Sequence, residues 1–221
     1  MGKNIRKILK ERDVGAIGIG AMIVFIAMVL VAGIAASVLV QTANTLEIQA
    51  MQTGRETTGE VASGIAVVDI EGHVNVDINN LVITIRPRAG SQDIDLSETF
   101  VEISDSSIKN VLTYSAAHFY NKTEIDGSIF TDAFYVGLTG QDFGIIVLED
   151  GDGSCTYTAP VINRGDKVML TVNCSASGAF GQELAERTDV WGIVVPEEGS
   201  TGMFGFRTPA SYGTTTVFDL Y

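Results

Sequence analysis

Cysteine, proline, histidine and tryptophan are all scarce in this chain. Its 221 residues include two cysteines, four prolines, two histidines and one tryptophan. Two widely spaced cysteines exclude a disulfide-dense scaffold and a C-x-x-C motif. His73 and His118 lie in no pattern typical of a general base or a metal ligand, so we expect each to be exposed or simply packed. Trp191 is expected in the core.

Catalytic and nucleotide-binding motifs are absent as well. The sequence contains no G-x-S-x-G, H-E-x-x-H or P-loop pattern. Gly15, Gly18 and Gly20 have the wrong spacing for a dinucleotide loop and follow no strand-like run. Carboxylates are plentiful, but no pair can be singled out as acid and base. We therefore predict a protein that is not an enzyme and has no cofactor, apart from the cation considered below.

Positive charge is scarce outside the N-terminus. The formal net charge is −13, yet the first 15 residues hold five basic and two acidic residues, so the remainder carries −16. An acidic body repels nucleic-acid phosphates and anionic lipid headgroups. We expect no nucleic-acid partner.

One long segment without charge dominates the N-terminal part. No charged residue occurs from Val14 to Leu46, whereas a membrane-spanning helix needs about 20 apolar residues and a cleavable secretory signal roughly 7–15. A soluble core helix is therefore excluded, and a discarded signal fits poorly. The basic cluster before the segment and the acidic body after it predict that the body lies outside the membrane.

The helix is also expected to be longer than a bilayer needs. At about 1.5 Å per residue, residues 16–46 span about 46 Å, against a hydrocarbon core of about 30 Å. Small residues that would let helices approach closely recur along it at four-residue spacing: Ala16 with Gly20, Ala32 with Ala36, and Gly33 with Ser37, with Gly18 nearby. An ordinary membrane anchor is one interpretation, and a helix that packs against copies of itself is the favoured one.

The sequence GIGAMIVFIAMVLVAGIAASVL, followed by QAMQTGRETTGEVASGI, resembles the N-terminal region of archaellins, the archaeal flagellins, which are similar in design to type IV pilins. The resemblance is strongest over residues 12–67. It implies a basic leader, residues 1–15, that a membrane peptidase removes between Gly15 and Ala16. Val14 departs from the charged residue that the family usually has there. Gly20 replaces the glutamate usual at the fifth mature position of bacterial pilins, which favours the archaellin branch.

The resemblance further implies a function. The chain would be inserted in the membrane as a precursor, and an assembly platform and its ATPase would then build it into an extracellular, rotating filament for swimming. Its partners would be copies of itself, the peptidase and that machinery. An adhesive type IV-like pilin is the nearest alternative. A membrane-anchored binding module or enzyme is the alternative from another class.

The pattern becomes strand-like after Gly64. Nine runs rich in Val, Ile, Thr and Phe, separated by turn residues, lie at 65–70, 73–78, 81–87, 99–104, 134–138, 144–149, 167–172, 190–196 and 215–220. Their spacing predicts a β-sandwich of about eight strands. The expected fold is α+β: a polymerisation helix at 16–63, then an immunoglobulin-like antiparallel β-sandwich at 64–221. The family's outer domain is likewise a β-sandwich.

Three further features of the body suggest possible modifications or ligands. Cys155 and Cys174 could form a disulfide outside the cell, or remain two buried thiols. Asn121-Lys122-Thr123 and Asn173-Cys174-Ser175 match the N-glycosylation acceptor pattern, and filament proteins of archaea are often glycosylated. Asp150 and Asp152, between Glu149 and Ser154, suggest either a Ca²⁺ or other divalent-cation site or an Asp-Gly hairpin turn.

Overall fold

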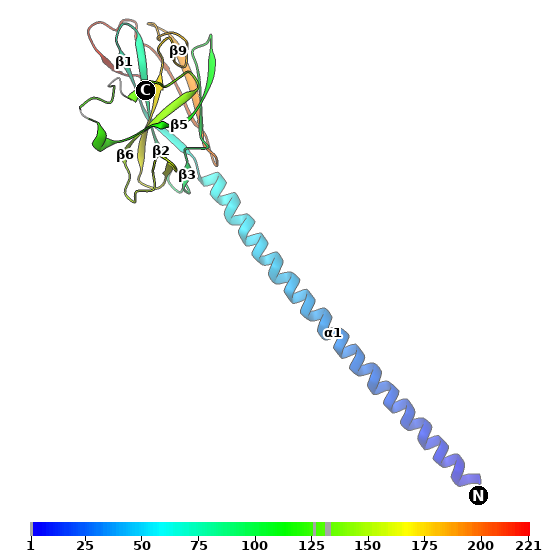
Figure 1. Ribbon diagram of the computed structural model, residues 1–221. Coiled ribbons are helices and arrows are strands. Elements are labelled where there is room, and N and C mark those ends of the chain that lie inside the picture. The colour runs from blue at the N-terminus through cyan, green and yellow to red at the C-terminus, as the bar shows by residue number, and fades with distance from the viewer. Residues whose placement is uncertain (1, 126, 131–133) are drawn as a thin grey trace. The chain divides into compact units, whose positions relative to one another are not determined.

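The computed structural model describes residues 2–125, 127–130 and 134–221, without the side chains of residues 2–14 and 16. The chain divides into two compact units, Met1–Arg55 and Glu56–Tyr221. We call the second the sheet unit. One helix, α1 (Gly2–Ala62), forms all of the described first unit and enters the second (Figure 1).

The helix is uninterrupted because nothing in its sequence breaks it. The first proline of the chain is Pro87, and residues 1–15 are rich in Lys and Arg, which favour helix. The helix ends where the backbone turns into the sheet. The Ser200 N–H donates to the Ser63 carbonyl at 2.8 Å, and a Cβ on Gly64 would lie 2.6 Å from the Ser200 carbonyl oxygen. Only glycine allows so close a backbone approach.

Besides the end of α1, the described residues of the sheet unit form eleven strands and one short 3₁₀ helix. The strands are β1 (Ile65–Val74), β2 (Ile78–Pro87), β3 (Ile94–Asp95), β4 (Phe100–Ser104), β5 (Lys109–Asn121), β6 (Asp142–Glu149), β7 (Val161–Ile162), β8 (Lys167–Asn173), β9 (Asp189–Val195), β10 (Gly202–Arg207) and β11 (Val217–Asp219), with η1 at Lys122–Glu124. Nine of them form one sheet in the order β10-β9-β4-β5-β6-β8-β2-β1-β11, and β3 pairs with β7.

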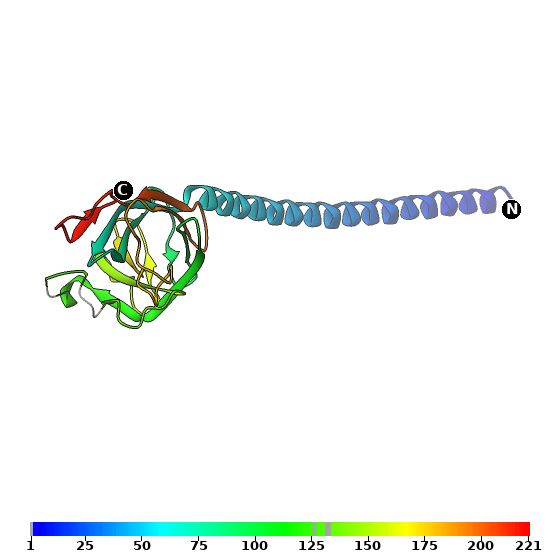
Figure 2. The same ribbon diagram turned by 90° about the horizontal axis from the view of Figure 1, so that it is seen from above.

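The large sheet curves round until its two sides meet, as the view in Figure 2 shows. The Ile65 N–H of β1 donates to the Ser200 carbonyl just before β10 at 3.1 Å, and a Cβ on Gly202 would lie 3.2 Å from the Ile65 carbonyl. The enclosed core contains Phe143, Phe180, Leu81 and many Ile and Val side chains. The two layers of the expected sandwich are thus parts of one continuous sheet.

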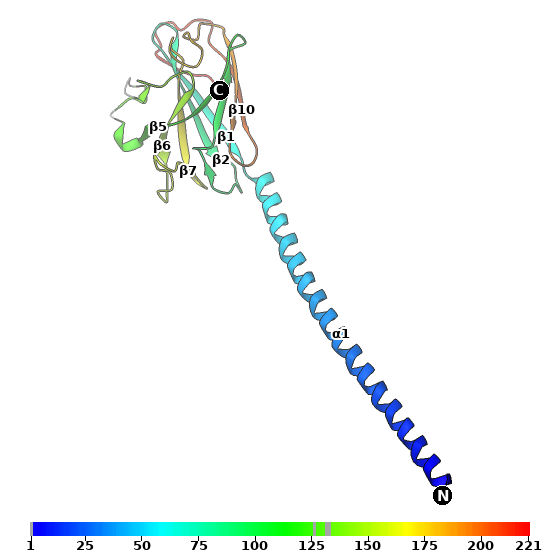
Figure 3. The same ribbon diagram turned by 45° about the vertical axis from the view of Figure 1, so that its right-hand side comes forward.

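Pairing within the sheet is antiparallel except between β5 and β6, which lie side by side in Figure 3. A parallel neighbour requires the chain to return to the other end of the sheet. The crossover connection between β5 and β6 is residues 122–141, and its described residues lie on the outer face of the sheet. Phe130, Phe134 and Tyr135 of this crossover pack on Val82 and Ile146 there and form a second, smaller core.

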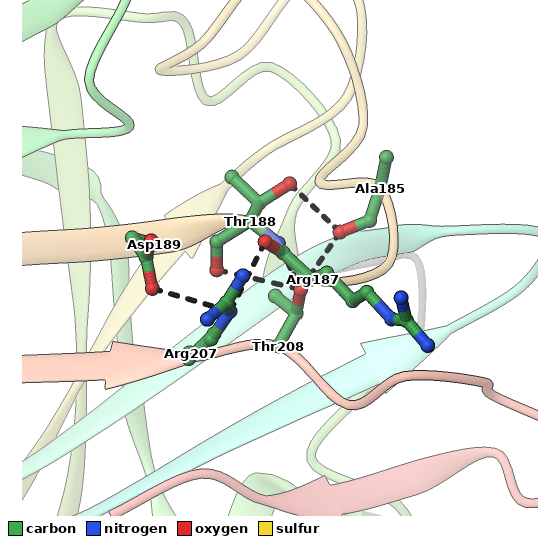
Figure 4. Close-up of polar contacts among 6 residues, drawn as sticks. All are labelled: Ala185, Arg187, Thr188, Asp189, Arg207 and Thr208. Atoms are coloured by element: carbon green, nitrogen blue, oxygen red, sulfur yellow. Dashed lines mark hydrogen bonds and ion pairs between the residues drawn. The ribbon is translucent and has the colours of Figure 1, made fainter.

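At the end of the sheet away from Ile65, side chains fix the loop before β9 to the end of β10 (Figure 4). The Thr208 hydroxyl donates to the Ala185 carbonyl at 2.8 Å, and the Thr188 N–H donates to the Thr208 hydroxyl at 2.7 Å. Arg207 and Asp189 form an ion pair at 3.4 Å. The loop therefore has a defined conformation although its residues are largely exposed.

The predicted fold class is confirmed, with local corrections. Residues 134–138 are not a strand, because their aromatic side chains pack onto the sheet rather than pair in it. Residues 73–78 are not a separate strand but contain the bend between β1 and β2. Strands β5 and β10 were not among the predicted runs. Trp191 is 45 % exposed rather than in the core, since it lies on the outer face of β9 with Lys109 5.8 Å from its ring.

Candidate functional site: the exposed helix and the loops of the sheet unit

The apolar part of α1 has no cover within the chain. Every described side chain from Ile17 to Thr58 is exposed, including Phe25 at 68 % and Leu39 at 70 %. The helix is long and apolar enough to cross a membrane, judged by length and composition. Soluble proteins rarely leave so large a continuous apolar surface in water. Lipid or other protein must therefore cover this helix.

The small residues of the helix have no explanation within a single copy. A Cβ added to Gly18, Gly20 or Gly33 would meet nothing within 4 Å. Glycine inside a helix costs about 1 kcal/mol relative to alanine. The predicted packing residues, which also include Ala32, Ala36 and Ser37, all face open space. Close approach by another helix would explain their small size.

Helix α1 runs through the predicted cleavage point without a break. Gly15 is exposed, and the side chain of Ala16 lies outside the described part. The expected separation of a leader from a helix is therefore not visible as a change in backbone structure. At its other end, Gly59 is buried against Gln92, and the compact sheet unit begins at Glu56, inside the helix.

The two predicted glycosylation sites differ in exposure. Asn121 ends β5 and is exposed, as are Lys122 and Thr123 of its acceptor triplet. Asn173 is 8 % exposed, and its side-chain amide donates to the Leu138 carbonyl at 3.0 Å. The folded chain does not offer this amide for modification, so the prediction at Asn173 is wrong for the folded protein. Glycosylation at Asn121 stays a prediction.

The predicted disulfide is wrong. Cys155 and Cys174 are both free and buried. Cys174 directly follows β8, whereas Cys155 lies near Asp166, which directly precedes β8. Seven residues of strand at about 3.3 Å each separate these two ends, while a disulfide needs Cα atoms within about 7 Å.

Both thiols are in environments that oppose ionisation. Burial, followed by the charges of Asp150, Asp166 and Asp95, raises the pKa of Cys155 to about 12. Burial alone raises the pKa of Cys174. Since the thiolate is the nucleophile and metal ligand, these cysteines are packing residues.

The predicted acidic turn is one part of a three-carboxylate cluster. Carboxylate oxygens of Asp150, Asp152 and Asp166 lie within 4.8 Å of one another. The Gly153 N–H donates to Asp150 at 2.7 Å, and the Asn163 side-chain amide donates to Asp152 at 2.6 Å. The hydrogen bond from Asn163 is the main reason that the pKa of Asp152 is lowered. Asp152 is thus favoured in its ionised form, and the hydrogen bonds hold the side chains of the cluster in place.

Asp166 was missed in the sequence analysis. It lies 14 residues after Asp152 and is 3 % exposed, and it accepts a hydrogen bond from the Asn163 N–H at 2.8 Å. Oxygen ligands of this kind suit Ca²⁺. The same contacts also describe a well-formed turn, so cation binding stays a prediction.

The histidines have structural contacts. His73 lies 3.0 Å from the Asn79 side-chain oxygen and stacks on Phe130 at 5.2 Å between ring centroids. His118 bridges the Ser115 hydroxyl and the Val136 carbonyl, at 3.1 and 2.9 Å. Both help to hold the crossover 122–141 on the sheet.

Comparison with known proteins identifies relatives by family model, by sequence and by structure. The family model described as archaeal-type flagellin matches residues 15–206. The chain is 48 % identical to flagellin B2 of Methanocaldococcus jannaschii over 202 residues, which cover 91 % of this chain and 92 % of that protein. It is 36 % identical to flagellin B3 of Thermococcus kodakarensis, with 97 % and 99 % covered.

Two solved structures share the fold. The crystal structure of archaeal flagellin FlaB1 from Methanocaldococcus jannaschii matches with a TM-score of 0.64 and 31 % identity, over 72 % of this chain and 97 % of that one. The archaeal flagellum of Methanospirillum hungatei matches with a TM-score of 0.58 over 92 % and 98 %, at 12 % identity, which shows the fold alone. This chain belongs to the archaeal-type flagellin family.

Proposed function

We infer that this chain is a structural subunit of the archaeal flagellum, the archaellum, and polymerises through α1 into an extracellular filament. The observation that carries this is the helix: it has no charged residue from Val14 to Leu46, its described side chains from Ile17 to Thr58 are all exposed, and it is part of a chain of this family. In the membrane precursor, lipid would cover the apolar surface of the helix. In the filament, neighbouring helices would cover the same surface.

Burial of the helix would hold a subunit firmly. Large apolar side chains from Ile17 to Met51 are each at least 53 % exposed in the single chain. At roughly 25 cal/mol per Å² of apolar surface, covering them would contribute tens of kcal/mol of gross stabilisation. We propose that the resulting filament is stiff enough to transmit rotation and propel the cell.

Maturation is proposed to remove residues 1–15. Five basic residues precede Gly15, as expected for a segment retained on the cytoplasmic side. The family match begins at residue 15, which supports a boundary there. Cleavage by a membrane peptidase would free Ala16 as the mature N-terminus.

Assembly would depend on other proteins. The sequence has no P-loop, so we propose that a membrane platform with its own ATPase supplies the energy for extracting and adding subunits. The same lack of catalytic motifs supports a role without enzymatic activity. An adhesive pilin would share the helix, but the family match favours the motility filament.

Deleting the gene in the source organism tests this function. We expect cells without surface filaments of this subunit and with reduced swimming in soft agar, restored by the wild-type gene. A Leu30→Glu variant should not restore filaments, because a charge on the apolar helix opposes burial. Swimming and filaments that persist unchanged in the deletion strain, while surface attachment is lost, would contradict the motility function and support the adhesive alternative.

A further inference from the structure

The sheet unit is strongly acidic, yet one end of it carries a cluster of cations. A pocket of about 430 Å³ is lined by Arg86, Arg88, Arg164 and Lys167, together with Glu149 and Asp166. Residues 16–221 contain only nine basic residues against 25 acidic ones. Almost half of the positive charge outside the leader therefore meets in one place.

Strand register brings these side chains together. Ile85 of β2 pairs with Val168 of β8, so Arg86 and Lys167, one step outward on each strand, are neighbours on the outer face. Like charges on adjacent strands destabilise a sheet. The arrangement therefore costs the single chain stability unless a counter-charge is present.

The chain supplies part of that counter-charge itself, because Glu149 of β6 is the register partner of Lys167, but four cations share the pocket with only two carboxylates. Among the described residues, the ion pairs are Lys109 with Glu102 and Arg207 with Asp189, and none involves a cation of the pocket. Asp166 accepts a hydrogen bond from the Asn163 backbone N–H at 2.8 Å. Arg88 donates to the Ile65 carbonyl at 3.3 Å rather than to a carboxylate.

We propose that this basic pocket binds carboxylates of a neighbouring copy of the chain in the filament. The inference rests on the proposed function, because polymerisation places copies next to one another at high effective concentration. Bodies with a charge of −16 repel one another, so packing them requires local complementarity. The carboxylates that enter the pocket belong to a different surface from the pocket itself. Such a heterologous contact joins copies head to tail and can repeat without closing, as a helical filament requires.

Zero-length carbodiimide crosslinking of sheared filaments tests this contact directly. The reagent joins a lysine to a carboxylate that touches it, and after leader removal the lysines are Lys109, Lys122 and Lys167. We expect crosslinked dimers whose mapped peptides join Lys167 to an Asp or Glu of a second copy, and loss of that dimer band in a Lys167→Gln variant. Lys109 should instead react with Glu102 of its own chain, at 2.6 Å, as an internal control.

A charge reversal provides the functional readout. Arg164→Glu should lower the temperature at which filaments dissociate, and 1 M salt should reduce the difference from wild type, because screening weakens exposed ion pairs. Lys122→Glu makes the same charge change at an exposed residue outside the pocket and should leave dissociation unchanged.

Two failures are distinguishable. If the chain is absent from the filament fraction, the proposed function fails. If filaments of this chain form but yield no Lys167 dimers, and Arg164→Glu behaves like Lys122→Glu, then the pocket holds only a free anion or none, and this inference is overturned.

Discussion

At the scale of residues, the return of the chain into β8 determines which side chains lie together near Asp150. Asp150 and Asp152 are recognisable because they share one turn, but Asp166 joins them only through the return of the chain into β8. Export of the body allows a disulfide between Cys155 and Cys174, but both thiols are free and buried, at opposite ends of that strand. Sequence spacing does not give spatial distance until strand order is known.

The carboxylate cluster predicts a cation-dependent stability of the sheet unit. Adding Ca²⁺ should raise the melting temperature, and chelator should reverse the change. At 100 times the dissociation constant the gain would be about 2.7 kcal/mol. Asp152→Asn should remove the Ca²⁺-dependent shift while leaving the melting temperature in chelator nearly unchanged, since Asp152 is exposed. A wild-type protein indifferent to both additions would exclude the site.

Glu71 predicts a pH-dependent stability. Burial, then the charges of Asp69 and Asp219, raise the pKa of Glu71 in the folded chain, and Asp219 is its register partner. The folded state therefore binds the proton more tightly than the unfolded state, so this group opposes folding above its folded pKa and the penalty disappears as pH falls below its unfolded value near 4.5.

Glu71→Gln should consequently raise the melting temperature at pH 7, by up to about 3 °C for a like-charge pair in a domain of this size, and the gain should vanish at pH 4. Scanning calorimetry at the two pH values measures it. Glu98→Gln, at an exposed residue outside the sheet, is the control. An equal gain at both pH values would point to packing rather than charge.

Because both cysteines are free, the chain should contain two alkylatable thiols. Alkylation of the denatured protein without reductant should add two labels per chain, and the native protein should react slowly, because both thiols are buried and opposed to ionisation. Mass spectrometry reads the count directly. A chain that accepts labels only after reduction would contain the disulfide that the structure excludes.

At the scale of elements, long periodic segments were predictable and irregular ones were not. The helix, β2 and β8 follow from uninterrupted patterns. Strand β5 was missed because Ser115-Ala116-Ala117 interrupts its alternation, at a register shift between Tyr114 and Phe119. Residues 134–138 were predicted as a strand because they are apolar, but Phe134 and Tyr135 are apolar for packing on the outer face of the sheet.

We predict that Gly33 of α1 is small because helices of neighbouring copies pack closely there. Gly33→Leu should not harm the helix of a single chain, since nothing lies within 4 Å of the added Cβ and leucine favours helix by most of 1 kcal/mol over glycine. In the filament it should prevent close approach and abolish or greatly reduce assembly. Val31→Leu, which also places a leucine on the helix but adds only one methylene at a residue that is already large, is the control, and electron microscopy counts the filaments. Normal filaments from Gly33→Leu would place Gly33 outside any helix contact.

For the whole molecule, the two units are matched to different surroundings. The helix has apolar surface without cover, whereas the sheet unit encloses its own core and carries the acidic surface. The sequence predicted this division because hydropathy and charge change near the helix end. It could not predict the basic pocket, because Arg86, Arg164 and Lys167 come together only through the order of the strands.

The most direct test of the account is mass spectrometry of the N-terminal peptide from filaments sheared off the cell surface. The account predicts a mature chain that begins at Ala16, so that the apolar helix is retained and exported within the polymer. A chain that begins at Met1 and stays in the membrane fraction, or a secreted chain that begins near Ala36 without the helix, would contradict it.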